Sequence, residues 1–394
     1  MINFLKEAYN IKDELIAIRR DIHKHPELGF QEERTSKLIK DFLTNEGIPY
    51  KESAKTGVCA SIKGEKTGIE KVIALRADMD ALPIEEKNNV SYKSVNKGKM
   101  HACGHDSHTT ILLGAAKILN EHKADFSGIV KLFFEPAEET TGGAPLMIED
   151  GVLENPKVDF VVGLHVNEDI ETGKIMVKSG SVNASSNPFK VKIKGKGGHG
   201  ATPDVAIDPI VTASLIITEL QTIVSREVHP ARPVVLTVAT IHSGTASNII
   251  PDEAEISGII RTVNEEDRTF IKKRFRQIVE GTAKSHNCSV DITIEEGYPS
   301  LINDTEVVNR ILKAAEEVIG KENIVEQKES SMGVESFAYF AKERPAAFYY
   351  LGTKNLLKST DKPAHGPFFN IDEEALPLGT ALQCTIAYEY LTRN

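Results

Sequence analysis

Residues 100–122 read MHACGHDSHTTILLGAAKILNEH, and this stretch decides the fold expected for the first half of the chain. After Asp106, apolar residues recur at helical spacing behind a Ser/Thr-rich start, which is typical of a helix N-terminus. The predicted helix leads to an apolar run at 129–134, and similar runs occupy 72–75 and 158–164. Short apolar runs without strict alternation are typical of strands buried on both faces of a parallel sheet.

The alternation of strands and helices predicts an α/β domain with a mixed, largely parallel sheet flanked by helices. In such sheets, ligands bind beyond the carboxyl ends of the strands. Polar residues that follow the three runs should therefore meet at one sheet edge, and they are Asp78, Asp80, Glu138, Glu139 and His165. We expect this catalytic domain to comprise residues 1–182 and 298–394.

The pattern changes between residues 183 and 297. Strands are predicted at 188–194, 234–241, 253–261 and 289–295, and helices at 207–225 and 265–285. The resulting order, βαββαβ, describes a ferredoxin-like unit with an antiparallel sheet and two helices on one face. We interpret this segment as an inserted dimerisation or lid domain.

Composition narrows the class of protein. The 394 residues carry a formal net charge of -10, which argues against a nucleic-acid partner, because such partners select basic surfaces. We see neither a signal peptide nor a run of about 20 apolar residues, so we expect no membrane partner. The four cysteines have no repeating spacing and predict no disulfide framework, so we expect a reducing, cytoplasmic location.

Cys103 and His105 combine a thiolate with an imidazole, which favours zinc, although manganese, cobalt or nickel are also tolerated. Taken singly, Cys103 could be a packed core residue, and His165 and His365 could be histidines satisfied by local hydrogen bonds. Taken together with one carboxylate, these residues supply enough ligands for two cations that keep room for water.

Glu138 and Glu139 are adjacent, so a loop that follows a strand can direct them to two different tasks. One carboxylate can bind a cation while the other stays free as a general base. A solvated acidic loop is the alternative. The position directly after the predicted strand KLFFEP favours the chemical role.

At these residues the sequence resembles the dinuclear metallo-aminoacylases, a family that includes hippurate hydrolases, N-acetyl-diaminopimelate deacetylases and indole-acetyl-amino-acid hydrolases. The likeness covers nearly the whole chain. Its motifs are HKHPELGFQEERTS at 23–36, LRADMDALPIEE at 75–86, MHACGHDSHT at 100–109, EPAEE at 135–139, GLHV at 163–166, GGHGATP at 197–203, SNIIPDEAEISGIIRT at 247–262 and AHGPFFNIDEEAL at 364–376. Several motifs in order are far more specific than any one of them.

The resemblance implies a role for each member of the constellation, with two divalent metal ions per subunit. It implies that Glu138 is the base and that the metal ligands are Cys103, His105, Glu139, His165 and His365. Related metallopeptidases carry a His-x-Asp pair where this chain has Asp78-Met79-Asp80. We therefore expect Asp80, and similarly Asp106, to orient metal ligands, and we expect His108 to start the helix.

The inserted segment adds His199, which can stabilise an oxyanion, and Asn248 and Arg261, which can hold substrate. Turn formation and solvation at a strand end are the alternatives for these residues. Family likeness favours function, and His199 could serve the site of a neighbouring subunit. Glu335 is a further candidate for substrate binding, whereas Ser336 stands where the family commonly has an aspartate, in the pattern Gly-Ser-Glu-Asp-Phe.

We therefore predict hydrolysis of N-acyl-L-amino acids to a carboxylate and a free amino acid, in a homodimer or homotetramer joined through the inserted domain. A dipeptidase or carboxypeptidase would use the same site, because a peptide is also an N-acyl amino acid. A noncatalytic metal-stabilised binding protein and a hydrolase with Cys103 as nucleophile are further alternatives. A carboxylate beside the ligands that is not itself needed to bind a structural ion favours an enzyme.

Overall fold

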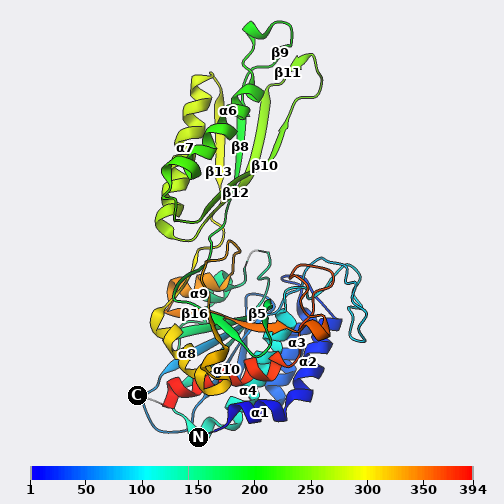
Figure 1. The fold of residues 1–394 in the computed structure, drawn as a ribbon, viewed down its shortest axis with the longest axis vertical. Coiled ribbons are helices and arrows are strands. Elements are labelled where there is room, and N and C mark those ends of the chain that lie inside the picture. The colour runs from blue at the N-terminus through cyan, green and yellow to red at the C-terminus, as the bar shows by residue number, and fades with distance from the viewer. Residues whose placement is uncertain (1, 141, 393–394) are drawn as a thin grey trace. The chain divides into compact units, whose positions relative to one another are not determined.

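The computed structural model describes residues 2–140 and 142–392, and the chain forms two compact units (Figure 1). The larger unit comprises Met1–Gly180, Ile302–Glu329 and Ser336–Asn394. The smaller unit comprises Ser181–Leu301 together with the short segment Ser330–Glu335. Within the described residues, no helix has both the length and the apolar character needed to cross a bilayer.

An eight-stranded sheet forms the centre of the larger unit, with the strand order β1-β2-β4-β3-β5-β16-β6-β15. The strands are β1 (Tyr50–Ser53), β2 (Gly57–Lys63), β3 (Val72–Asp78), β4 (Ile129–Glu135), β5 (Phe160–Glu171), β6 (Ile175–Val177), β15 (Ile324–Glu326) and β16 (Ala346–Lys354). The β3 strand pairs in parallel with β4 and β5, and β5 pairs in parallel with β16. Antiparallel pairs join β1 to β2, β2 to β4 and β6 to β16. The mixed, largely parallel sheet predicted from the sequence is confirmed.

Helices cover both faces of this sheet, which explains why every residue of β3 is buried. One face carries α1 (Phe4–Asn10), α2 (Lys12–Lys24), α3 (Glu33–Asn45), α4 (His105–Glu121), α8 (Thr305–Ile319) and α10 (Ala375–Thr392). The other face carries α5 (Ala144–Glu149) and α9 (Phe337–Glu343), where Phe340 stacks on Phe133 of β4 at 5.5 Å between ring centroids. Both layers press on the central strands and fix their positions.

The smaller unit has the element order βαββαβ that the sequence predicts. Its elements are β8 (Asn187–Lys194), α6 (Pro209–Thr222), β10 (Val234–Ser243), β12 (Glu253–Thr262), α7 (Glu265–Ser285) and β13 (Ser289–Ile294). The four strands form an antiparallel sheet in the order β10-β12-β8-β13, and both helices share one apolar core with it. A small extension pairs β9 (Gly198–His199) with β11 (Ile249–Ile250).

The remaining elements are short. The strands β7 (Gly180–Asn183) and β14 (Leu301–Asn303) lie where the chain passes from one unit to the other. Single helical turns occupy Lys123–Asp125, Pro203–Val205, Ile223–Glu227, Lys321–Asn323 and Leu356–Lys358.

The α6 helix starts at Pro209, two residues later than predicted, because Asp208 caps it by accepting hydrogen bonds from the N–H groups of Ile210 and Val211. We expect Asp208→Ala to lower the free energy of unfolding of the smaller unit by about 1 kcal/mol, the usual cost of losing such a cap. Urea unfolding followed by circular dichroism would measure the change. The matched control is Asp204→Ala, which removes an exposed carboxylate that caps no helix and should leave the midpoint unchanged.

Candidate metal centre

Three parallel strands bring most of the predicted site residues to one edge of the larger sheet. Asp78 is the last residue of β3 and lies opposite Glu135 at the end of β4. Glu138 and Glu139 follow β4 by three and four residues, and His165 lies in β5. The strand ends therefore meet as the sequence predicts for this sheet type.

Gly104 sets the chain direction between Cys103 and His105. Its φ angle of 92° lies in the left-handed region, and a Cβ atom there would lie 2.2 Å from Cγ2 of Val166. Only glycine meets both constraints without a clash. The α4 helix begins directly afterwards at His105, earlier than the start predicted after Asp106.

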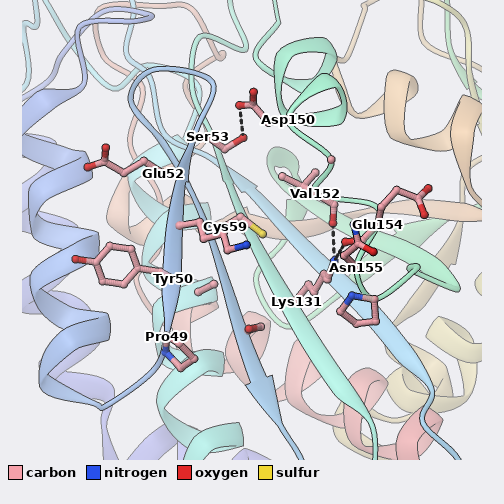
Figure 2. A pocket seen from close by; sticks show the side chains of 15 residues that line it. Pro49, Tyr50, Glu52, Ser53, Cys59, Lys131, Asp150, Val152, Glu154 and Asn155 are labelled. Carbon is pink, nitrogen blue, oxygen red and sulfur yellow. Dashed lines mark hydrogen bonds between the residues drawn. The ribbon is translucent and has the colours of Figure 1, made fainter.

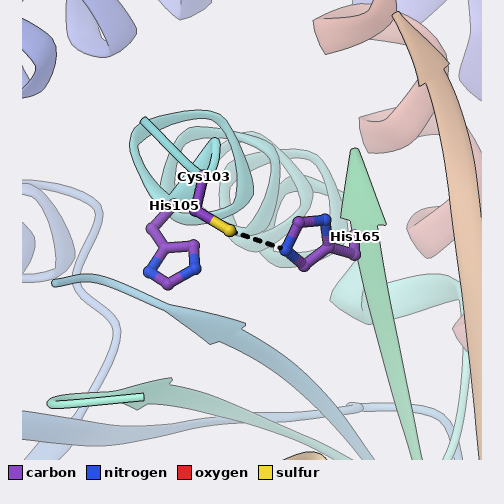
Figure 3. Close-up of side chains that lie close together, drawn as sticks. All are labelled: Cys103, His105 and His165. Atoms are coloured by element: carbon purple, nitrogen blue, oxygen red, sulfur yellow. Dashed lines mark hydrogen bonds between the residues drawn. The ribbon is translucent and has the colours of Figure 1, made fainter. Parts of the chain in front are cut away.

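The five predicted ligands come together in one cluster. Cys103 Sγ lies 3.4 Å from His165 Nε2 (Figure 3). Donor atoms of the predicted ligands lie within 4.8 Å of one another in two overlapping groups, Cys103–His105–His165 and Cys103–Glu139–His365. Two further groups with the same spacing, His105–Glu138–Glu139 and Asp78–His105–His108, share His105 with the first. Glu139 Oε1 also lies 3.1 Å from His365 Nε2 and 3.9 Å from His105 Nε2. One thiol, three imidazoles and one carboxylate thus face a common space.

The hydrogen bonds of two imidazoles leave the same nitrogen available for a metal ion. His105 donates from Nδ1 to Asp80 at 3.1 Å, and its buried Nε2 has no hydrogen-bond partner among the residues that the structure describes. His165 donates from Nδ1 to the carbonyl of Val166 at 2.6 Å, and its Nε2 faces the thiol of Cys103. An imidazole anchored through one nitrogen and open at the other is the usual form of a metal ligand, so these residues fit divalent ions.

Asp80 hydrogen-bonds both to the ring of His105 and to the backbone of the glutamate pair. One carboxylate oxygen accepts the N–H of Glu138 at 3.0 Å as well as the His105 bond, and the other accepts the N–H of Glu139 at 3.1 Å. The chain reaches these glutamates through Ala137, which has a φ of 56°. Asp80 therefore fixes the glutamate turn and the ring of His105 at the same time.

The electrostatics of the cluster favour a cation over a nucleophilic thiol. Burial, reinforced by Glu139, raises the pKa of the Cys103 thiol well above its ordinary value. Burial alone would lower the pKa of His105, but Asp78 and Asp80 outweigh it and raise that pKa. A reactive cysteine needs a lowered pKa, so the environment disfavours Cys103 as a nucleophile and suits a thiolate that is formed by binding a cation.

His108 and Asp78 form a pair that sequence reasoning did not foresee. His108 lies in the first turn of α4, donates from Nδ1 to Asp78 at 2.6 Å, and accepts the N–H of Val166 on Nε2 at 2.9 Å. Burial lowers the pKa of His108 to about 4, which keeps the ring neutral. Both ring nitrogens are occupied, so His108 supports the strand that carries His165. The Asp78-Met79-Asp80 pattern after a strand was the only sequence signal for this pair.

Asp106 makes its contacts away from the ligand cluster. Its carboxylate lies 2.8 Å from Arg19 Nε and 2.7 Å from His23 Nδ1, both on α2. Burial opposes its ionisation, but Arg19 and His23 hold the pKa of Asp106 far below its usual range. The structure therefore places Asp106 where it anchors α4 to α2, rather than in contact with a predicted ligand.

The remaining predicted residues lie in the smaller unit. His199 is exposed in β9, and its Nδ1 accepts the N–H of Ala201 at 3.0 Å, which leaves Nε2 available. The carbonyl of Asn248 accepts the N–H of Gly200 at 2.8 Å, so Asn248 lies beside His199.

Arg261 and Glu335 complete this set. Arg261, at the end of β12, donates to the carbonyl of Met332 at 2.7 Å, and burial lowers its pKa. Glu335 is buried within the segment Ser330–Glu335. The main chain of this distant segment therefore contacts the guanidinium of Arg261, a pairing that strand patterns did not predict.

A separate cavity of about 280 Å³ lies at the β1–β2 edge of the larger unit (Figure 2). Its lining includes Cys59, Asp150 and Lys131, whose ammonium group donates to the carbonyls of Val152 at 2.9 Å and Glu154 at 2.7 Å. Burial raises the pKa of Cys59 to about 11. None of the predicted metal ligands lines this cavity, so it is distinct from the cluster.

Comparison with known proteins yields matches over nearly the whole chain. Residues 74–389 match the profile of Peptidase family M20/M25/M40. The chain is 42% identical to the N-acetyl-L-cysteine deacetylase of Bacillus subtilis, over 94% of this chain and 88% of that protein. It is 39% identical to thermostable carboxypeptidase 2 of Saccharolobus solfataricus, over 98% and 97%. A crystal structure of a dinuclear metal-binding peptidase of the M20 family from Bacillus subtilis superposes with a TM-score of 0.84 at 36% identity, covering 97% of this chain and 99% of that one.

The ligand cluster predicts how metal content responds to substitution. We expect Cys103→Ala to reduce the divalent ion content measured by plasma mass spectrometry by at least one ion per chain, because the thiol belongs to both donor groups. The melting temperature of the ion-loaded protein should fall as well, because an ion that binds only the folded state stabilises it. The matched control is Cys59→Ala, whose thiol lies outside the cluster and whose loss should leave the ion content unchanged. Full ion content in Cys103→Ala would exclude the thiol as a ligand.

Proposed function

We propose a function from one premise: the chain belongs to Peptidase family M20/M25/M40. The protein is an amidohydrolase that cleaves the linear amide of N-acyl-L-amino acids and releases a carboxylic acid and a free amino acid. The observation that carries this proposal is the position of the Glu138 carboxylate, which lies within 4.8 Å of donor atoms of the proposed ligands His105 and Glu139. A purely structural zinc site is normally saturated by four protein ligands and has no use for such a base.

The ligand set supports two divalent ions, drawn from manganese, zinc, cobalt or nickel. The proposed ligands are Cys103, His105, Glu139, His165 and His365. When bound, the ions supply Lewis acidity, which polarises the acyl carbonyl and lowers the pKa of water from 15.7 toward about 7. A B. subtilis structural relative is described as dinuclear, which supports the count of two.

Proton transfer is the task of Glu138. Its Oε1 accepts the N–H of Ser336 at 2.9 Å, and its own N–H is held by Asp80, so the carboxylate has a defined direction. Glu138 takes a proton from the attacking water and returns it to the departing amine. A base held in this way contributes about 10²- to 10⁴-fold to rate.

The smaller unit supplies the groups proposed to meet the substrate. His199 is exposed and has Nε2 available to stabilise the tetrahedral oxyanion. Arg261 is suited to hold the substrate carboxylate, with Asn248 and Glu335 as further contacts. These roles rest on the chemistry of the side chains and on the family resemblance.

We also propose that two chains pair through the smaller unit. The β10 strand is an edge strand, and edge strands are natural pairing surfaces. Exposed apolar side chains accompany it, with Ile241 on β10 at 50% exposure and Val211 on α6 at 50%. A symmetric dimer would cover both features, and such a dimer could offer His199 to the site of the partner.

Hydrolysis of a carboxyl-terminal peptide bond is the second candidate function. The favouring observation is the 39% identity with the thermostable carboxypeptidase of Saccharolobus solfataricus. The bond and the catalytic groups are the same in both reactions, so the acyl portion of the substrate decides between them.

A substrate panel tests the function directly. Acetyl-, benzoyl- and indoleacetyl-amino acids, N-acetyl-diaminopimelate and dipeptides would each be assayed with protein reloaded with Mn, Zn, Co or Ni. We expect higher kcat/KM for at least one simple N-acyl amino acid than for any dipeptide. A reversed order would establish the peptidase alternative, and chelator-insensitive activity would exclude the metal mechanism.

Glu138→Gln serves as the control for chemistry in the panel, because it keeps the size of the side chain and removes the base. It should retain its ions while kcat falls about 10²- to 10⁴-fold. Glu149→Gln removes an exposed carboxylate on α5 and should keep wild-type turnover. Near-normal turnover in Glu138→Gln would exclude Glu138 as the base.

Mixed dimers test whether His199 acts across subunits. Glu138→Gln and His199→Ala chains, each inactive alone, would be co-refolded in equal amounts. If His199 serves the partner's site, half of the dimers are mixed and each holds one complete site, which gives about a quarter of wild-type turnover. Continued inactivity in dimers that sedimentation shows to be mixed would assign His199 to its own subunit.

A further inference from the structure

Ser336 contacts the proposed base from a fully buried position at the start of α9. Its hydroxyl donates to Glu135 Oε1 and accepts a hydrogen bond from the Arg76 guanidinium at 3.2 Å. Its backbone N–H donates to Glu138 Oε1. One residue therefore joins a buried ion cluster to the carboxylate proposed to move protons.

The ion cluster is built around Arg76, which is buried in the middle of β3. The guanidinium lies 2.7 Å from Glu135 Oε2 and 2.6 Å from Asp78 Oδ2. Glu135 Oε1 also accepts the N–H of Ala144 at 2.7 Å. Two carboxylates already face this one cation, and a third at position 336 would add a buried negative charge next to Glu135. A serine at that position hydrogen-bonds to both Arg76 and Glu135 without adding charge.

The cluster continues to the strand that bears His165. Asp78 uses its second oxygen to accept the Nδ1–H of His108, and His108 holds the N–H of Val166. Hydrogen bonds thus run without interruption from the Glu138 carboxylate, through Ser336 and Arg76, to the residue after His165. A shift of the Glu138 carboxylate or of Val166 would therefore move the groups between them. These groups are buried, so water cannot easily replace a hydrogen bond that breaks.

We propose, resting on the function assigned above to Glu138, that Ser336 is a positioning residue for the base and that Glu135 supplies the buried negative charge beside its hydroxyl, so that position 336 itself needs no carboxylate. The Ser336 hydroxyl contacts the Glu135 carboxylate and Arg76 directly, so the negative charge can be moved from residue 135 to residue 336 without changing the net charge of the cluster. Burial and both hydrogen bonds of the hydroxyl exclude Ser336 from direct contact with substrate. Its effect on catalysis is indirect, through the direction of Glu138.

A double-mutant cycle tests the proposal by moving the buried carboxylate from residue 135 to residue 336. It compares Glu135→Gln, Ser336→Asp and the double variant with the wild type. Each single substitution should lower the unfolding midpoint by about 5 °C or more. Glu135→Gln removes a carboxylate that pairs with Arg76, and Ser336→Asp adds a buried carboxylate that no further cation balances. The double variant should regain the wild-type midpoint to within about 2 °C. Additive losses in the double variant would overturn the charge relocation.

Kinetics distinguish positioning from a merely structural role. At a temperature where all variants are folded, the single variants should lose at least about tenfold in kcat, with KM and ion content unchanged, and the double variant should recover kcat. Recovery of the midpoint without recovery of kcat would overturn the positioning role. The matched control, Glu149→Gln with Ser336→Asp, restores the same net charge at an exposed site and should rescue neither quantity.

The two proposals fail in different ways. A wild-type protein that hydrolyses nothing in the substrate panel would refute the proposed function, while the unfolding midpoints would still decide the charge relocation. An active wild-type protein whose double variant shows no rescue would refute the inference about Ser336 and leave the function standing.

Discussion

The parallel pairing of β3 with β4 and β5 is the constraint on which the candidate centre depends. It places Asp78 opposite Glu135 and carries the chain from each strand into the same region. Because side chains alternate along a strand, a register shift by one residue would turn Arg76 away from its buried partners. The apolar layers on both faces prevent that shift, so core packing sets the geometry of the polar groups.

Charge balance within this packing is the second constraint. Arg76 and Arg19 are both fully buried, and each is matched by buried carboxylates, Asp78 and Glu135 in one case and Asp106 in the other. Such clusters are costly to break, because removal of one partner leaves a buried charge without compensation. The two arginines therefore lock the start of α4 and the ends of β3 and β4 in place more strictly than apolar contacts alone.

Much of the fold could be predicted because its strands and helices follow from the local spacing of apolar residues in the sequence. Continuous apolar runs identified β3, β4 and β5, and the predicted order of the smaller unit matches the observed one. Glu138 and Glu139 could be found because they closely follow β4, and Cys103 and His105 because a thiol and an imidazole stand two residues apart in the sequence. The network of Arg76, Glu135 and Ser336 could not, because it joins residues up to 260 positions apart and depends on side-chain directions inside the core. The packing of Ser330–Glu335 with the smaller unit was missed for the same reason.

Hydrogen bonding, rather than residue type, separates the histidines of the cluster. His105, His108 and His165 have rings within 6.0 Å of one another, so proximity does not distinguish them. Both ring nitrogens of His108 hydrogen-bond to groups outside the ligand set, Asp78 and Val166. His105 and His165 each anchor Nδ1, and the Nε2 of His165 contacts only a fellow proposed ligand, Cys103. An imidazole with both nitrogens engaged can bind a metal only by breaking a buried hydrogen bond, which costs about 1–3 kcal/mol. The partner of Nε2 therefore distinguishes the proposed ligands His105 and His165 from the supporting residue His108. The fold determines this partner, so the sequence motif alone cannot reveal it.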